Sequence, residues 1–233
     1  HNFNIYHHLF AKWHCWRLPL IVVDIETTGL EPERNQIISI GAVDFANPRR
    51  TYYNECRLSR GVKVSKAALE ITGFSLPQLK DRHKPALKQI LQEFLKWTRT
   101  CKERTLAGEN PWFDATFLRR ALSEYGLAYP FGHRYVDLHS VSYATLLRAG
   151  KRAMVSNGVS SLSLDKTLRC LELEPRKGFH DALTDAKLEA EAFSRLIYGK
   201  TLFKEYSKQD LPPHLGDRRG SHTGTRRSSR TAT

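Results

Sequence analysis

Four carboxylic acids and one histidine fall in three short clusters that are widely separated along the 233-residue chain. Carboxylate oxygens suit Mg²⁺ and Mn²⁺, and histidine titrates close enough to neutral pH to act as a general base. Two divalent cations and a base suit the hydrolysis of phosphodiesters, so the clusters predict a site for that chemistry. They read Asp24-Ile25-Glu26-Thr27-Thr28-Gly29, Asn110-Pro111-Trp112-Phe113-Asp114 and His180-Asp181-Ala182-Leu183-Thr184-Asp185.

The first acidic pair continues a run of apolar, β-branched residues that is typical of a buried strand. Asp24 and Glu26 are two positions apart, so the alternation of side chains along a strand places both on one face. An isolated pair of this kind is common on a solvated edge strand. Here the preceding Leu20-Ile21-Val22-Val23 favours burial, and buried carboxylates need a compensating charge such as a metal ion.

Asp114 is expected in the first turn of a helix that begins near Trp112. On its own, an acid at this position is explained by the helix dipole. Asn110 follows a predicted strand, and Phe113 is an apolar anchor, so in this context we expect Asp114 at the top of the sheet, facing the first acidic pair. The Trp112 side chain is either part of the core or a stacking surface for a base.

The third cluster places a histidine and an acid five positions apart. Five residues of an α-helix turn about 500°, so His180 and Asp185 would not share a face if both were helical. We therefore expect His180 in the loop before the last helix and Asp185 early in that helix, with Asp181 as its N-cap. Lys177-Gly178 would give the loop mobility.

These positions predict a two-metal mechanism. One cation, held by Asp24, Glu26 and Asp185, would lower the pKa of a bound water, and His180 would take the proton. The second cation, held chiefly by Asp24 with Asp114 acting directly or through water, would stabilise the leaving 3′ oxygen. Four carboxylates balance two Mg²⁺ or Mn²⁺ ions, so the loaded site is near neutral and can admit a phosphate.

Residues beside the acids are candidates for contacts with the substrate. Thr27, Thr28 and Gly29 form the turn after the first strand. The threonines offer hydroxyl and backbone N–H groups to a nucleotide end, and glycine permits a close backbone approach. Asn110 and Phe113 are the corresponding candidates in the second cluster.

The hydrophobic pattern predicts strands and helices that position these clusters. Three early strands joined by short turns suggest an antiparallel meander, and the later apolar stripes have helical spacing. Together they indicate an α/β fold. The expected strands are 18–23, 37–45, 51–58, 105–108 and 135–138, and the expected helices are 87–97, 112–125, 138–149, 160–171 and 181–199.

Composition indicates one globular domain with additional segments at both ends. The net charge of +13 predicts attraction to a polyanion through phosphate contacts, although a basic surface also serves solubility alone. We expect an N-terminal arm over residues 1–17, a catalytic domain over 18–199 and a basic, disordered tail over 200–233. The arm contains four histidines and a cysteine, but their spacing matches no standard metal site.

Cysteine usage and hydropathy bear on location. The four cysteines form no paired motif, so we expect them to be reduced. No apolar run approaches the roughly 20 residues that cross a bilayer, and the first residues lack the pattern of a signal peptide. We therefore expect no membrane association and a cytoplasmic location.

The three clusters, with Ile37-Ile38-Ser39-Ile40-Gly41-Ala42-Val43 after the first, resemble the histidine-type Asp-Glu-Asp-Asp exonucleases over residues 19–198. That family includes ribonuclease T and oligoribonuclease, and the likeness is strongest to the proofreading exonucleases of bacterial DNA polymerase III. The resemblance implies a ribonuclease H-like fold, with a five-stranded mixed sheet flanked by helices. It further implies removal of nucleoside monophosphates in the 3′-to-5′ direction, with Thr27 and its neighbours on the 3′-terminal nucleotide.

The chain departs from the family pattern at Glu109 and Pro111, where a histidine and a small residue usually flank the asparagine. The carboxylates keep their spacing, so the departure concerns substrate contacts more than catalysis. The expected partner is single-stranded nucleic acid or a 3′ end of DNA or RNA, within or outside a larger replication, repair or processing complex. The alternatives are an RNA-trimming enzyme and a non-catalytic nucleic-acid-binding adaptor on the same fold.

Overall fold

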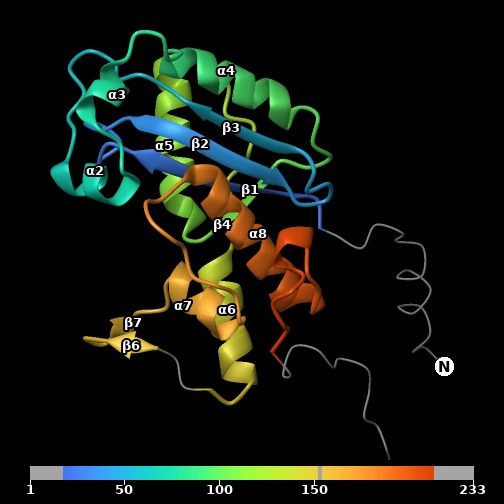
Figure 1. The fold of residues 1–233 in the computed structure, drawn as a ribbon. Helices are drawn as coiled ribbons and strands as arrows, with labels where there is room; N and C mark the ends of the chain where they lie inside the picture. Colours follow the sequence, from blue (N-terminus) through green and yellow to red (C-terminus); the bar gives the residue numbers. More distant parts are fainter. Residues whose placement is uncertain (1–17, 152–153, 213–233) are drawn as a thin grey trace, which may run out of the picture.

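The computed structural model describes residues 18–151 and 154–212, which form a five-stranded sheet with helices on both faces (Figure 1). The strand order is β3-β2-β1-β4-β5; β1, β2 and β3 pair antiparallel, whereas β4 and β5 continue the sheet parallel to β1. The predicted meander and the mixed sheet are therefore confirmed. The strands are β1 (Leu20–Thr27), β2 (Ile37–Asp44), β3 (Thr51–Glu55), β4 (Thr105–Gly108) and β5 (Tyr135–Asp137).

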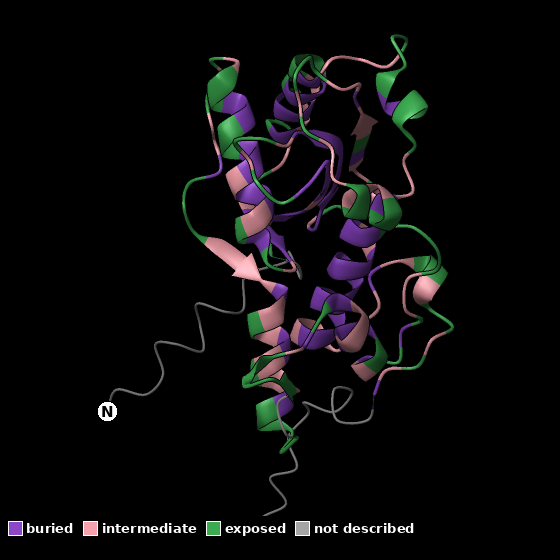
Figure 2. Ribbon diagram, turned by 90° about the vertical axis from the view of Figure 1, so that its left-hand side faces the viewer, coloured by how far each residue is buried: buried purple, intermediate pink, exposed green. Residues whose placement is uncertain are grey.

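Two groups of helices cover the two faces of the sheet, and each group shares a hydrophobic core with it. On one face lie α4 (Leu87–Thr98) and α5 (Pro111–Glu124). On the other lie α6 (Leu138–Arg148), α7 (Leu164–Cys170) and α8 (Ala182–Tyr198). Buried residues gather in the sheet and on the helix surfaces that face it (Figure 2). Among the described residues, no helix is long and apolar enough to cross a membrane.

Several short elements were not predicted. Helices α2 (Lys66–Thr72) and α3 (Leu76–Lys80) lie between β3 and α4, and η1 (Lys204–Tyr206) follows α8. A hairpin of β6 (Val155–Ser156) and β7 (Val159–Ser160) precedes α7, so the helix expected from residue 160 begins only at Leu164. The hairpin turns at Asn157-Gly158, where both residues have positive φ, 51° and 79°. Asn-Gly suits such a tight turn, so this dipeptide is a local sequence signal for the hairpin.

The two faces of β1 explain where its acids point. Ile21 and Val23 belong to the core beneath α4 and α5, whereas Leu20 and Val22 belong to the core beneath α8. Because side chains alternate along a strand, the acids of β1 continue the second set. Strand β1 runs to Thr27, so both acids lie within it, as predicted.

Helix α8 approaches β2 very closely at its first turn. A Cβ atom at Gly41 would lie 2.1 Å from the carbonyl carbon of Ala182 and 2.2 Å from the backbone nitrogen of Leu183. Such distances are far inside van der Waals contact, so this approach requires glycine. Gly41 thereby sets the height of the start of α8 above the sheet.

The C-terminal half of α8 contains a fully buried ion pair. Arg195 Nε donates to Glu191 Oε1 at 2.8 Å, and both residues are 0% exposed. Glu191 Oε2 accepts from the backbone N–H groups of Leu202 and Phe203 at 2.8 and 3.0 Å. The rest of the guanidinium donates to carbonyl oxygens of Leu171, Tyr206, Gln209 and Asp210.

This ion pair ties residues 202–210 to α8, although a tail was expected from residue 200 onward. Residues 213–233 and the arm over residues 1–17 lie outside the described part of the chain, as does the histidine-rich segment within that arm.

Candidate active site

A cleft of about 540 Å³ lies at the carboxyl ends of β1 and β4. In open sheets with parallel strands, ligands bind at this edge. Both polar and apolar side chains line the cleft. The polar lining residues include Asp24, Glu26, Glu109, Asn110, Asp114, Arg176, His180 and Glu189, and the apolar ones include Leu30, Ala67, Ala68, Ile71, Phe113 and Leu162.

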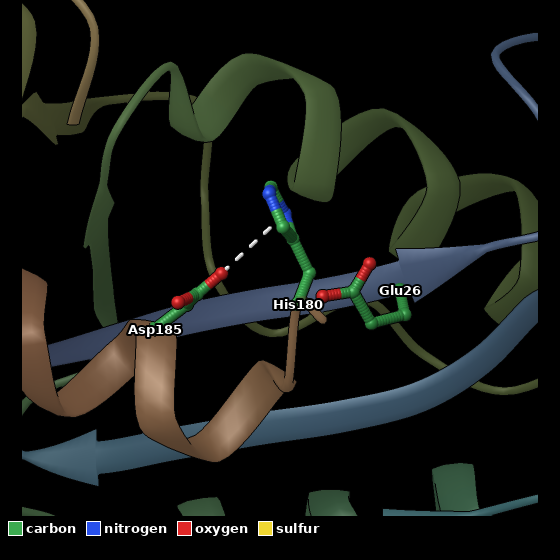
Figure 3. A group of neighbouring side chains, drawn as sticks. All are labelled: Glu26, His180 and Asp185. Carbon is green, nitrogen blue, oxygen red and sulfur yellow. Dashed lines mark ion pairs between the residues drawn. The ribbon is translucent and has the colours of Figure 1, made fainter. Parts of the chain in front are cut away.

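Glu26, His180 and Asp185 converge from two elements (Figure 3). Glu26 extends from β1, His180 lies just before α8, and Asp185 lies in the first turn of that helix, as predicted. One potential ligand atom from each residue lies within 4.8 Å of the other two. His180 Nδ1 is 3.6 Å from Asp185 Oδ2. The Asp181 side chain accepts from the Thr184 N–H and caps α8, which confirms its predicted role.

Asp114 is attached to β1 by its own carboxylate. The pairing of β1 with β4 ends at Val22 and Ala107, and beyond this point Asp114 Oδ1 accepts from the Ile25 N–H at 3.0 Å. Asp114 occupies the first turn of α5 and is 5% exposed, so the helix brings it against the strand that carries Asp24. The structure therefore brings together all five residues that were predicted to form the site.

The site raises the pKa values of its carboxyl groups. Burial raises the pKa of Glu26 to about 8, with the charges of Asp185 and Asp114 adding to the effect. Burial also raises the pKa of Asp114 to about 8, although backbone N–H groups oppose the shift. Desolvation and then the charge of Glu189 raise the pKa of Asp24. Such shifts arise where burial and like charges disfavour ionisation.

The donor set fits a divalent cation. Glu26 is 6% exposed, and its Oε1 has no hydrogen-bond partner within the described residues. A carboxylate oxygen of Glu26 lies within 4.8 Å of one of Asp185, and hard oxygen ligands of this kind suit Mg²⁺ or Mn²⁺. A cation placed there would also favour the ionised carboxylates that burial disfavours.

Arg176 was not predicted as a site residue, yet its guanidinium contacts Asp165, His180 and Asp185. Nε pairs with Asp165 Oδ1 at 2.9 Å, and Nη1 lies 2.8 Å from Asp185 Oδ2 and 3.0 Å from His180 Nδ1. Burial and then the charge of Arg176 lower the pKa of His180, whereas Asp185 and Asp165 oppose the shift. A single arginine four positions before a histidine carries no pattern, so only the fold reveals this contact.

Two further acids of the cleft, Glu189 and Glu109, were not predicted as site residues. Glu189 follows Asp185 by four positions on α8, a spacing that a search of the helix face would have found. Glu189 is 1% exposed, and its Oε2 lacks a hydrogen-bond partner within the described ranges. Glu109, where the family usually has a histidine, has a pKa raised to about 7 by burial and then by Asp137.

The predicted substrate contacts after β1 are largely engaged within the protein. Thr27 Oγ1 donates to the Gly29 carbonyl oxygen at 2.7 Å, and Thr28 Oγ1 donates to the Lys63 carbonyl oxygen at 2.8 Å. Thr27 and Gly29 line the cleft, but the fully buried Thr28 does not. A Cβ at Gly29 would lie 2.6 Å from the side-chain amide of Asn35, so this glycine makes room for a neighbouring side chain.

The second cluster presents its side chains differently. Asn110 has a left-handed backbone, with φ of 54°, and its N–H donates to Asp137 Oδ1 at 3.1 Å. Phe113 lines the cleft and stacks obliquely on Phe117, with ring centroids 4.9 Å apart. Trp112 is 66% exposed, which excludes it from the core.

The sequence of the whole domain has clear relatives. A profile of the exonuclease family matches residues 21–193. DNA polymerase III subunit epsilon of Rickettsia typhi is 32% identical over 192 residues, which cover 81% of this chain and 78% of the relative. The 3′-5′ DNA exonuclease Cap18 of Escherichia coli is 29% identical over 184 residues, 76% of this chain and 90% of the relative. PolC-type DNA polymerase III of Thermotoga maritima is 29% identical, but this chain spans only 12% of that protein.

Solved structures establish the same fold. The nuclease domain of 3′hExo, a DEDDh family member bound to rAMP, superposes with a TM-score of 0.60 at 18% identity, covering 79% of this chain and 94% of that domain. E. coli exonuclease I in complex with a dA16 oligonucleotide superposes with a TM-score of 0.62 at 18% identity, covering 84% of this chain and 42% of that chain. With the family profile spanning most of the chain, the protein belongs to the exonuclease family, and its acids and histidine resemble those of the histidine-type Asp-Glu-Asp-Asp group.

Proposed function

We propose that this exonuclease is metal-dependent and releases nucleoside monophosphates from the 3′ ends of nucleic acid by hydrolysing the terminal phosphodiester bond. The observation that carries the proposal is the convergence of three distant segments on one cleft: β1, the start of α5 and the start of α8. Buried like charges are unfavourable in isolation. Their concentration at a ligand-binding edge is accounted for when cations and a phosphate complete the site.

Two Mg²⁺ or Mn²⁺ ions fit the carboxylates. Asp24, Glu26 and Asp185 would hold one ion, and Asp24 with Asp114 would hold the other. When bound, the ions supply Lewis-acid activation of water and stabilise the leaving 3′ oxygen. The unpartnered Oε1 of Glu26 supports this assignment, as does the approach of a Glu26 carboxylate oxygen to within 4.8 Å of one of Asp185.

His180 would act as the general base. Its pKa is lowered, so the imidazole is neutral and can accept a proton at neutral pH. A guanidinium can only donate, so Arg176 Nη1, at 3.0 Å, occupies the lone pair of His180 Nδ1 and leaves the ring proton on Nε2. His180 must therefore part from Arg176 before Nδ1 can accept a proton from water.

Arg176 can change partners without leaving the site. Its Nη1 pairs with Asp185, which is a proposed metal ligand. Its Nε pairs with Asp165, which is not proposed to bind metal. When a cation takes the charge of Asp185, the bond to Asp165 would keep the guanidinium at the cleft. A planar guanidinium suits a phosphate group, so we propose that Arg176 then contacts the substrate.

The cleft and the charge of the protein support a single-stranded 3′ end as the substrate. The apolar lining residues would contact the terminal base and sugar, the polar lining residues would contact the phosphate, and the net charge of +13 would attract the rest of the strand. The exposed Trp112 offers a stacking surface near the cleft. Thr27, Gly29, Asn110 and Phe113 remain the proposed substrate contacts, because all four line the cleft.

The relatives support both DNA and RNA. One relative is named as a DNA exonuclease, whereas one solved neighbour was bound to rAMP. RNA trimming is therefore retained as the second candidate. The similarity to DNA polymerase III subunits further supports a role beside a polymerase or in another nucleic-acid-processing complex.

A direct test uses matched DNA and RNA oligonucleotides that are blocked at either the 3′ or the 5′ end. The purified protein should release nucleoside monophosphates from 5′-blocked strands in Mg²⁺ or Mn²⁺, spare 3′-blocked strands, and become inactive in EDTA. The ratio of the DNA and RNA rates identifies the preferred sugar. Binding of the strands with equal, negligible release by the wild type and Asp24→Ala would instead identify a non-catalytic adaptor.

A further inference from the structure

Helix α8 directs a second acid into the cleft for which the proposed mechanism has no role. Glu189 follows Asp185 by one helical turn, so both side chains lie on the same face of α8. Glu189 is 1% exposed and lines the cleft, and its Oε2 has no hydrogen-bond partner in the described part of the chain. A buried, unpartnered carboxylate oxygen that lines a cavity calls for a ligand in that cavity.

The Glu189 carboxylate reaches the point where β1 and β4 lie side by side. A Cβ at Gly108 would lie 3.1 Å from Glu189 Oε2 and 2.9 Å from the Val23 carbonyl oxygen. Gly108 therefore leaves space for this carboxylate next to the residue that precedes Asp24.

We infer that Glu189 is a fifth carboxylate of the cation site and strengthens the binding of the two divalent cations that Asp24 would help to hold. This inference rests on the proposed function, since it concerns the same cations. The charges are compatible, because five carboxylates and the Arg176 guanidinium leave four negative charges, which two dications neutralise. A site assembled in this way would still admit the phosphate of a substrate.

Glu191 provides a matched control on the same helix. It lies two positions after Glu189 and is equally buried, but both of its oxygens have partners in Arg195 and the backbone. A loss of charge at position 191 should therefore affect folding and leave cation binding unchanged. A loss of charge at position 189 should instead weaken cation binding and leave folding intact.

The experiment titrates Mn²⁺ alone into the metal-free intact protein, followed by calorimetry and by the shift in melting temperature. Glu189→Gln should weaken Mn²⁺ binding by about 10- to 100-fold, the range typical for groups that support a metal site. It should also leave the metal-free melting temperature equal or higher. Glu189→Leu, which buries no polar group, should behave in the same way, whereas folded Glu191→Gln should bind Mn²⁺ like the wild type.

Wild-type Mn²⁺ affinity in both variants at position 189 would overturn the inference. Equal weakening by Glu191→Gln would overturn it too, because the effect would then follow from loss of any acid on α8. The proposed function fails separately: a wild-type protein that releases no nucleotide, while Glu189→Gln still weakens Mn²⁺ binding, would refute the nuclease and retain the fifth carboxylate.

Discussion

The two halves of α8 bury acids in opposite ways. In the C-terminal half, Glu191 and Arg195 neutralise each other, and the polar atoms of both side chains have partners. In the N-terminal half, Asp185 pairs with Arg176, but Glu189 and Glu26 of β1 each keep a buried carboxylate oxygen without a hydrogen-bond partner among the described residues. A buried acid that the chain itself neutralises holds the fold together. One that the chain leaves unneutralised costs stability and is available to an external cation.

Replacement of Asp24 by asparagine should give the largest effect on activity. Nucleotide release should fall by about 1,000-fold or more, as for removal of one member of a catalytic unit. Loss of a like charge should at the same time raise the free energy of unfolding of the metal-free protein. Rate assays and urea unfolding in EDTA test the two effects. A variant that is both inactive and less stable than the wild type would contradict the contrast between the two halves.

The opposite half of α8 should show the largest effect on stability. Arg195→Met leaves Glu191 buried without its partner and should cost about 3–5 kcal/mol of unfolding free energy. The double variant Arg195→Met with Glu191→Leu should regain part of this loss, because neither charge then remains buried. Urea unfolding measures both, and the activity per folded molecule should stay at the wild-type level. Equal stability of the single and double variants would argue against the ion pair as the cause.

The metal-free protein should lose stability as the pH rises. Glu26 and Asp114 have pKa values of about 8 in the folded protein and ordinary values of 4.5 and 3.8, so the folded state binds more protons between these limits. Each such group lowers the unfolding free energy by about 1.4 kcal/mol per pH unit within its window. Urea unfolding in EDTA at pH 5, 6.5 and 8 should show that the unfolding free energy falls as the pH rises.

Saturating Mg²⁺ or Mn²⁺ should remove much of this loss, since the cations favour the ionised carboxylates. The fall should also be smaller in Asp24→Asn, because one of the interacting charges is gone. Stability that rises between pH 5 and 8 without metal would show that the carboxylates are compensated within the protein.

Arg176→Gln should have the smallest effect of the four. The guanidinium competes with a cation for Asp185, so its removal should strengthen Mn²⁺ binding by about three- to tenfold, which corresponds to about 1 kcal/mol for a partly buried charge contact. Calorimetric titration measures the change, with Arg169→Gln as a control on the exposed surface of α7. Weaker Mn²⁺ binding would show that Arg176 supports the site and does not compete with the metal.

Local rules predicted the residues whose positions depend on their own element. Strand parity placed Asp24 and Glu26 on one face, and helical geometry separated His180 from Asp185. The hairpin at Asn157-Gly158 and the capping box of Ser75 and Gln78 at the start of α3 likewise have local sequence signals.

Other features depend on contacts between elements that are distant in sequence. The partners of Arg176 come from α7 and α8 as well as from its own loop, and the Thr28 hydroxyl is taken by a carbonyl 35 residues away. The extension of the packed chain to residue 210 likewise depends on Arg195, whose five donors meet carbonyls and a carboxylate from three segments. Residue types alone do not reveal such partners, because each of these side chains has many partners available before the chain folds.

Gly41 offers no functional group to the cleft, yet it governs the spacing of those that do. Any side chain at this position would lift the start of α8 and carry Asp185 away from Glu26. A mutational scan scored by activity alone would therefore rank position 41 with the catalytic acids. Transplanting the catalytic residues onto another scaffold would likewise fail without a glycine at the equivalent strand position. The contact of this glycine with the backbone of α8 sets the distance between Asp185 and Glu26.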